Sequence, residues 1–420
     1  MPADHPQPPS PAPPDGGPSP AWLRLSGALA AASAPKSLAM AVVGVVLTRL
    51  GTWASRVIFP GEQTGVGLGW RLAPGISEGQ GWGAGLGSAS SIAADPWFVL
   101  LDPLRGLFAI GRGNAVFARS LVELAWVVLV WGLVGGAIAR MAAVGAAAPG
   151  GEGLGIGSAL RFVGRRVASL VTAPLGPLAL VAGLAIPGAV LGLIGRWGSE
   201  LSGGIASALA IVPILLAVPS AMLVLGVAFT WPLMVLTVAV EGEDGFEALG
   251  RAFSYARRRA GHYALAVLGS WGLGTVGVLL VGLFAGLVVH LASWAFALGG
   301  EDRWVEAGFR SRSPAIGVPD PDRLRAISRA LDSRGNAPPP SFDDLPRLRP
   351  DTFLGVWIRC VGLVAYAWAF SFFWSAFARI YLLLRREVDG TPWEDLYDPV
   401  EDAEPFAPDP PAQPGPPPRP

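Results

Sequence analysis

Three stretches of the chain, residues 172–195, 205–240 and 264–300, contain no Asp, Glu, Lys or Arg. Each is at least as long as the roughly 20 apolar residues that a helix needs to cross the ~30 Å hydrocarbon core of a bilayer. Apolar residues make up 52% of the chain and charged residues 15%, whereas a water-soluble domain carries about 25% charged residues. The chain is therefore predicted to be an all-α, polytopic integral membrane protein.

Six runs have the length and apolarity of a membrane span, at about residues 37–59, 119–139, 172–195, 205–240, 264–294 and 355–380. The first is the weakest, because its uninterrupted apolar part, SLAMAVVGVVLT, is also short enough for a segment in the membrane interface. The 205–240 run carries Pro213, Pro219 and Pro232. It is interpreted as one tilted or kinked span, with a hairpin of two half-helices as the alternative.

The spans lie within a predicted transmembrane domain of residues 21–398. Residues 1–20 and 399–420 are rich in proline and have little apolar surface to bury, so both tails are predicted to be disordered. The proline tract also occupies the place where a signal peptide would have its apolar stretch. Residues 60–117 and 301–350 are interpreted as external loops.

The basic residues are almost all arginine, with Lys36 as the single lysine, and their positions predict the topology. Six spans place the short arginine-bearing segments around residues 24, 140, 161–166, 251–259 and 385–386 on one side of the membrane. The positive-inside rule makes that side cytoplasmic. The expectation is an inner (plasma) membrane protein with both termini in the cytoplasm.

Two of these basic segments have the pattern of an amphipathic helix. In FEALGRAFSYARRRAGH, apolar side chains recur at spacings of three and four while Arg251, Tyr255 and Arg258 share another face; SALRFVGRRVASLV repeats the pattern before the third span. Such helices lie in the membrane interface and bind anionic lipid. The predicted headgroup-binding residues are Arg161, Arg165, Arg166, Arg251, Arg257, Arg258 and Arg259.

The two basic segments also suggest an internal repeat. Arg165 and Arg166 align with Arg258 and Arg259 at an offset of 93 residues, and residues 21–37 resemble a third copy. The repeated unit would be an interfacial helix, an outward span, an external loop, an inward span and an acidic turn, and it would form parallel repeats. Gly188 with Gly192, and Gly282 with Gly286, have the spacing of closely packed helices, with a homo-oligomer contact as an alternative.

Four passages carry a family resemblance: VWGLVGGAIARMAAV (130–144), ALRFVGRR (159–166), EGEDGFEALGRAFSYARRR (241–259) and IYLLLRREVDGTPWEDLY (380–397). They resemble uncharacterised multi-pass membrane proteins of planctomycete-type bacteria, which are distantly similar to the membrane domain found beside glycerophosphoryl diester phosphodiesterases. The catalytic domain of those enzymes has no counterpart in this chain. The resemblance implies a membrane role and no reaction.

Charged residues within the first two spans form the sharpest candidate for a site, because ionisable groups in a membrane are costly. At about 1.5 Å per residue, Arg56 and Glu123 would lie at the same depth, with Arg49 deeper. The favoured hypothesis is a structural ion pair. A polar path for ions or small solutes, and a first span that does not cross the membrane, are the alternatives.

The sequence contains no GKS or GKT, HExxH or paired CxxC motif. With the single Cys360 and three scattered histidines, neither a metal site nor a cofactor is predicted, and the separated basic patches make nucleic acid an unlikely partner. The chain is therefore interpreted as a non-enzymatic membrane protein that engages anionic lipids or supports a membrane complex. The alternatives are a small-solute transporter or channel and, third, a lipid-modifying enzyme.

Overall fold

The computed structural model describes residues 21–59, 82–110, 113–148, 153–196, 199–298 and 350–396. These residues form helices and no strand. The elements are α1 (Ala21–Ser33), α2 (Pro35–Ile58), α3 (Trp82–Leu107), α4 (Gly113–Ala147), α5 (Ile156–Arg165), α6 (Val167–Gly195), α7 (Glu200–Ala208), α8 (Ile211–Leu236), the π-helix η1 (Thr237–Glu241), α9 (Gly245–Arg258), α10 (Ala260–Leu298), α13 (Pro350–Asp389) and the 3₁₀-helix η4 (Trp393–Leu396).

Six of these helices are long and apolar enough to cross a membrane: α2, α4, α6, α8 with η1, α10 and α13. The all-α, six-span class is therefore confirmed. The 205–240 run contains one membrane-length helix, α8 with η1, preceded by the short α7. The predicted tails, and most of the predicted loop at 301–350, lie outside the described residues.

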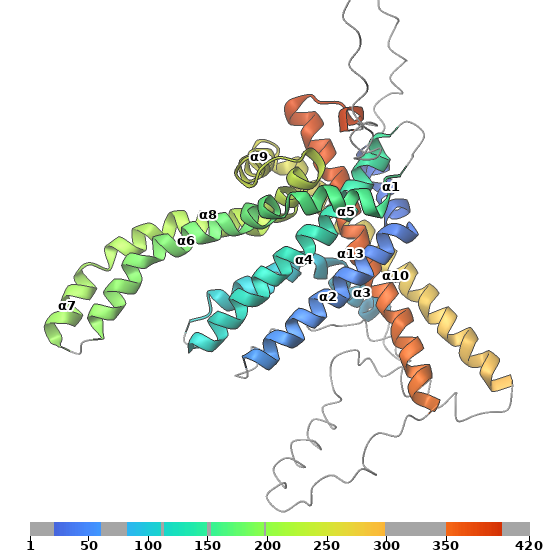
Figure 1. Ribbon diagram of the computed structural model, residues 1–420, viewed down its shortest axis with the longest axis horizontal. Coiled ribbons are helices and arrows are strands. Elements are labelled where there is room, and N and C mark those ends of the chain that lie inside the picture. Colours follow the sequence, from blue (N-terminus) through green and yellow to red (C-terminus); the bar gives the residue numbers. More distant parts are fainter. Residues whose placement is uncertain are drawn as a thin grey trace, which may run out of the picture.

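The long helices converge at one end of the molecule and splay apart at the other (Figure 1). The converging end is formed by the last turns of α4, η1 and α13 together with α1, α5 and α9. The splayed end is formed by the opposite ends of α2, α4, α10 and α13. These two names are kept below.

The centre of the fold is the contact between α4 and α13. Trp131 of α4 stacks on Phe370 of α13 with ring centroids 4.6 Å apart, and Trp374 of α13 packs edge-on against Trp231 of α8 at 5.5 Å. Phe373 stacks on the other side of this group, 5.9 Å from Trp231. Buried aromatic side chains thus fill the contact between α4, α8 and α13.

The prediction that residues 60–117 form an external loop is wrong for residues 82–107, which form α3. This helix packs against α4, α10 and α13, and its Trp97 contacts Phe373 and Phe377. Pro96 and Pro103 lie inside it, and together with two aspartates they lower the apolar signal. Packing against neighbouring helices supplies the stabilisation that the local sequence lacks.

Helices α6 and α8 form a long hairpin with α7 at its tip, and this hairpin extends away from the other spans (Figure 1). Many of its large side chains are exposed, including Ile186, Ile214 and Met222. Exposed apolar side chains along a membrane-length hairpin are suited to contact with lipid.

With α3 and α7 left aside as insertions between the two long helices, a short helix is followed by two long ones three times: α1, α2, α4; α5, α6, α8; and α9, α10, α13. The break between short and long helix falls at Arg166 in the second unit and at Arg259 in the third, the residues aligned at the 93-residue offset. The φ and ψ angles are −113° and 22° at Arg166, and −128° and 41° at Arg259. This agreement supports the repeat as an inference.

Candidate functional site at the turn after the fourth span

The fourth span ends in a π-helix, residues 237–241, followed by Gly242 with a φ of 81°. This left-handed conformation favours glycine, because a side chain would meet its own backbone. The turn leaves the last backbone carbonyls of the span without partners in the helix. π-Helical turns of this kind are frequently found at functional sites.

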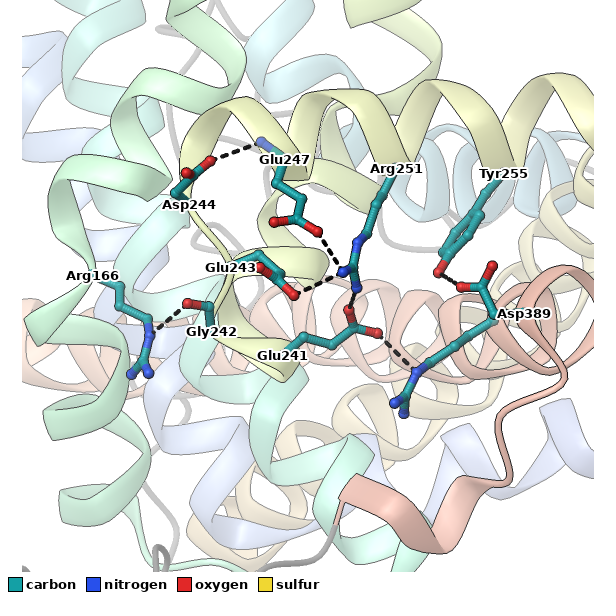
Figure 2. A network of polar contacts seen from close by, with 10 residues as sticks. Arg166, Glu241, Gly242, Glu243, Asp244, Glu247, Arg251, Tyr255 and Asp389 are labelled. Atoms are coloured by element: carbon teal, nitrogen blue, oxygen red, sulfur yellow. Dashed lines mark hydrogen bonds and ion pairs between the residues drawn. The ribbon is translucent and has the colours of Figure 1, made fainter.

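Two arginines from other helices bind these carbonyl groups. Buried Arg140 of α4 donates from Nη1 to the carbonyl oxygens of Ala239 (3.3 Å) and Val240 (3.2 Å). Arg166 donates from Nε to the carbonyl of Gly242 at 3.0 Å (Figure 2). Their positive charges also complement the negative end of the helix dipole.

The same two guanidinium groups enclose Phe162 of α5. The guanidinium carbon of Arg140 lies 3.2 Å from the ring centroid and that of Arg166 lies 3.8 Å away. Cation–π contacts of this kind are strongest where water is excluded. They join α4, α5 and α6 to the end of η1.

A carboxylate cluster follows the turn, defined here as Glu241, Glu243 and Glu247 around Arg251 of α9 (Figure 2). Arg251 binds Glu241, Glu243 at 2.9 Å and Glu247 at 2.5 Å. Glu241, whose side chain is only 7% exposed, also binds Arg385 of α13 at 2.9 Å. The cluster therefore joins η1, α9 and α13 at the converging end.

Burial, the bond with Glu247 and the neighbouring carboxylates raise the pKa of Glu243, although Arg251 acts in the opposite direction. Burial by itself lowers the pKa of Arg251, but its bond with Glu247 and the charges of the three carboxylates raise it on balance. The guanidinium group is thus held in its charged form among acids that would otherwise repel one another.

The two ends of α9 are also fixed. Asp244 is the N-cap, and its Oδ1 accepts from the backbone N–H groups of Phe246 (2.9 Å) and Glu247 (2.8 Å). Near the other end, the buried Tyr255 donates to Asp389 at the end of α13 (Figure 2). Burial and this bond raise the pKa of the Tyr255 phenol.

These contacts separate the seven arginines predicted to bind lipid into two groups. Arg166 and Arg251 bind protein groups at the turn. The other five are exposed on α5, on α9 and at the break that follows α9: Arg161, Arg165, Arg257, Arg258 and Arg259. Tyr255 was assigned to the face with Arg251 and Arg258, but it is buried against α13.

The residues of the predicted intramembrane ion pair are arranged differently. Glu123 binds Arg119 of its own helix at 2.9 Å and accepts from the hydroxyl of Ser55 on α2. The two spans thus meet at Ser55 and Glu123. The predicted pair of Glu123 with Arg56 stays a prediction, because the Arg56 side chain lies outside what the structure describes. Arg119 was not among the predicted residues, although its place one turn before Glu123 is a signal that sequence reasoning can use.

Deeper in the bundle, the third charged residue, Arg49 of α2, lies near a polar group from α3. Asp95 accepts from the hydroxyl of the buried Tyr366 at 3.0 Å. Both Arg49 and Asp95 interact electrostatically with this tyrosine. Because Asp95 belongs to a helix that was predicted as a loop, its place in the bundle could not be found from the sequence.

Within the described ranges, no group of three or more His, Cys, Asp or Glu side chains is placed to hold a metal ion. Cys360 is a free, exposed thiol. The features described define the class of this molecule as an all-α, multi-pass membrane protein. Comparison with protein-family models, curated proteins and solved structures found no match.

Proposed function

We propose that this chain is a non-enzymatic integral membrane protein that engages anionic lipid headgroups through α5 and α9, and so organises the membrane or supports a membrane complex. The observation that carries this proposal is the division of the arginines at the converging end. Arg166 and Arg251 hold the two helices in place, while five neighbouring arginines remain exposed. Guanidinium groups presented in this way suit phosphate recognition.

The proposal places the converging end at the cytoplasmic surface of the inner membrane, with both termini in the cytoplasm. The arginine distribution supports this orientation through the positive-inside rule. In support, α1 and the end of α13 lie at the converging end (Figure 1). The orientation is tested with single cysteines introduced at Arg257 and Arg386. We expect both cysteines to be labelled from inside the cell and not from outside. Labelling only from outside would overturn the orientation.

The lipid test compares the full-length protein extracted in native nanodiscs with a variant in which all five exposed arginines are changed to Gln. The lipids around the wild-type protein are expected to be enriched in anionic species. No such enrichment is expected around the variant. The control changes Arg196 and Arg359, which are exposed on α6 and α13 away from the converging end, to Gln. Equal enrichment for all three proteins would contradict the proposal.

A second candidate function, small-solute transport, is favoured by one observation. Arg49, Asp95 and Tyr366 place polar and charged groups between α2, α3 and α13, and such groups within a membrane mark solute paths in many proteins. The aromatic packing between α4, α8 and α13 opposes this candidate, because buried rings fill the contact between those helices.

A further inference from the structure

An apolar groove of about 430 Å³ lies where α9 crosses the α6–α8 hairpin. It is lined by Leu180, Leu184, Pro219, Met222, Leu223 and Phe253. The volume lies within the range of about 300–1,000 Å³ that is usual for sites of small organic ligands. Every lining side chain is apolar, so the groove offers no hydrogen bond to a polar ligand.

Phe253 forms the part of the groove that comes from α9. Its ring lies on the bare backbone of α8 at Gly226, where an added β-carbon would come within 2.1 Å of a ring carbon. The opposite walls are open, since Leu180 is 56% exposed and Met222 is 70% exposed. The groove is therefore closed at α9 and open along the hairpin, where lipid chains lie.

The exposed arginines of α9 begin one helical turn beyond this groove. Arg257 follows Phe253 by four residues, which places it on the same side of the helix, and its side chain is exposed. A single molecule that reaches both features must have an apolar chain and an anionic head. In a membrane, that combination is an anionic phospholipid.

We propose that the groove holds one acyl chain of a bound anionic phospholipid whose phosphate lies at Arg257. This inference rests on the proposed function and gives it a site. It distinguishes a lipid retained at one place from the mobile lipids that surround any membrane protein. Burial of each methylene in the groove stabilises the complex, and the guanidinium group provides the preference for charge.

The first experiment uses the unmodified protein, so that folding of a variant does not enter. The full-length chain in detergent is irradiated with phosphatidylglycerol that carries a diazirine near the end of one acyl chain, and the labelled residues are mapped by mass spectrometry. Labelling concentrated at residues 180–184 and 219–223 is expected. Labelling spread evenly along α6, α8 and α10 would overturn the inference.

The second experiment fills the groove. Leu184→Trp and Leu223→Trp place a large ring within it, and Leu193→Trp and Leu215→Trp are the controls, because these exposed leucines lie on the same helices outside the groove. Native mass spectrometry follows the delipidated proteins during titration with phosphatidylglycerol or with phosphatidylcholine of the same chains. The groove variants are expected to lose the first bound lipid, and the controls to keep it.

The role of the Arg257 charge is tested by Arg257→Gln. This change should weaken the affinity for the first bound phosphatidylglycerol about fivefold and leave the affinity for phosphatidylcholine unchanged. The inference is overturned if the groove variants bind the first lipid as well as the controls do. The proposed function still stands in that case if the variant with all five arginines changed loses its enrichment in anionic lipid. If the groove is labelled but neither the wild type nor any variant prefers phosphatidylglycerol to phosphatidylcholine, both the groove inference and the proposed function are overturned.

Discussion

Gly135 of α4 lies against the indole ring of Trp374 on α13, so that a β-carbon added at Gly135 would come within 2.2 Å of a ring carbon. Other aromatic side chains meet glycines of neighbouring helices in the same way, among them Trp126 at Gly51, Trp368 at Gly277 and Phe253 at Gly226. The helices therefore approach through a bare backbone on one side and a large ring on the other, rather than through small residues on both.

Gly135→Ala is expected to lower the free energy of unfolding by about 1–3 kcal/mol, because the added methyl group must displace the buried indole. Gly192→Ala on α6 is the matched control, since nothing lies within 4 Å of an added β-carbon there. The control should be neutral or slightly stabilised, as alanine favours the helix. Thermal melting followed by tryptophan fluorescence in one detergent compares the two, and equal melting temperatures would contradict the packing.

The six spans could be predicted because the requirement for them is local. A run such as 172–195 is long enough and apolar enough to cross a membrane whatever its neighbours are. Helix α3 could not be predicted, because Asp95, Pro96, Asp102 and Pro103 weaken the local signal and its stability comes from α4, α10 and α13. The four glycine contacts depend in the same way on which helices become neighbours.

The site shows the same division between local and distant information. The sequence predicted two faces for α9, but the face with Arg251 and Tyr255 was assigned to lipid. Their partners Glu241 and Asp389 come from the ends of two other helices, and no pattern within 246–262 identifies them. Arg258, which lies on the predicted basic face, is exposed, and so are its neighbours Arg257 and Arg259.

Arg140→Gln is expected to destabilise the protein by about 2–4 kcal/mol, because two carbonyl groups at the end of η1 and the ring of Phe162 lose a buried partner. Arg140→Lys keeps the charge but lacks the planar guanidinium group that lies over the Phe162 ring, so an intermediate loss is expected. Arg161→Gln, an exposed arginine on α5, should change stability by less than about 0.5 kcal/mol. A melting temperature of Arg140→Gln equal to that of Arg161→Gln would argue against the capping role.

Arg251→Gln is expected to destabilise the protein by about 1–2 kcal/mol near neutral pH, less than for a deeply buried pair, because the Arg251 side chain is 35% exposed. The loss should depend on pH. Glu243 already has a raised pKa in the folded protein, and without Arg251 that pKa rises further. A carboxyl group with a raised folded pKa contributes stability below its unfolded pKa and loses it as the pH rises through the folded pKa.

The deficit of Arg251→Gln relative to the wild type should therefore grow from about pH 5 to about pH 8. Chemical unfolding at several pH values measures it, with Arg257→Gln as the control for the loss of an exposed charge. Adding Glu243→Gln to Arg251→Gln should remove part of the pH dependence. A stability deficit that does not change with pH would show that repulsion among the carboxylates does not contribute to the destabilisation of Arg251→Gln.

The bond between Tyr255 and Asp389 can be measured with a double-mutant cycle of Tyr255→Phe and Asp389→Asn. A coupling free energy of about 0.5–1.5 kcal/mol is expected, because the phenol is buried even though the carboxylate is exposed. His262 and Glu387 form a comparison pair between α10 and α13 at 2.9 Å, with both side chains more than a third exposed. Their coupling should be smaller, and an equal or larger value would contradict the stronger bond expected for Tyr255 and Asp389.

Glu123→Gln tests the remaining alternatives for the first two spans. Loss of the carboxylate leaves Arg119 as an unpaired charge, with a side chain only 12% exposed, so destabilisation by about 1–3 kcal/mol is expected. Arg119→Gln together with Glu123→Gln should recover part of this loss, because no charge then remains to be paired. Thermal melting measures both variants.

Ion and small-solute flux in proteoliposomes should be the same for the wild type and for Glu123→Gln, because this ion pair fixes α4 against α2 through Ser55. A changed flux with an unchanged melting temperature would instead favour the transport candidate.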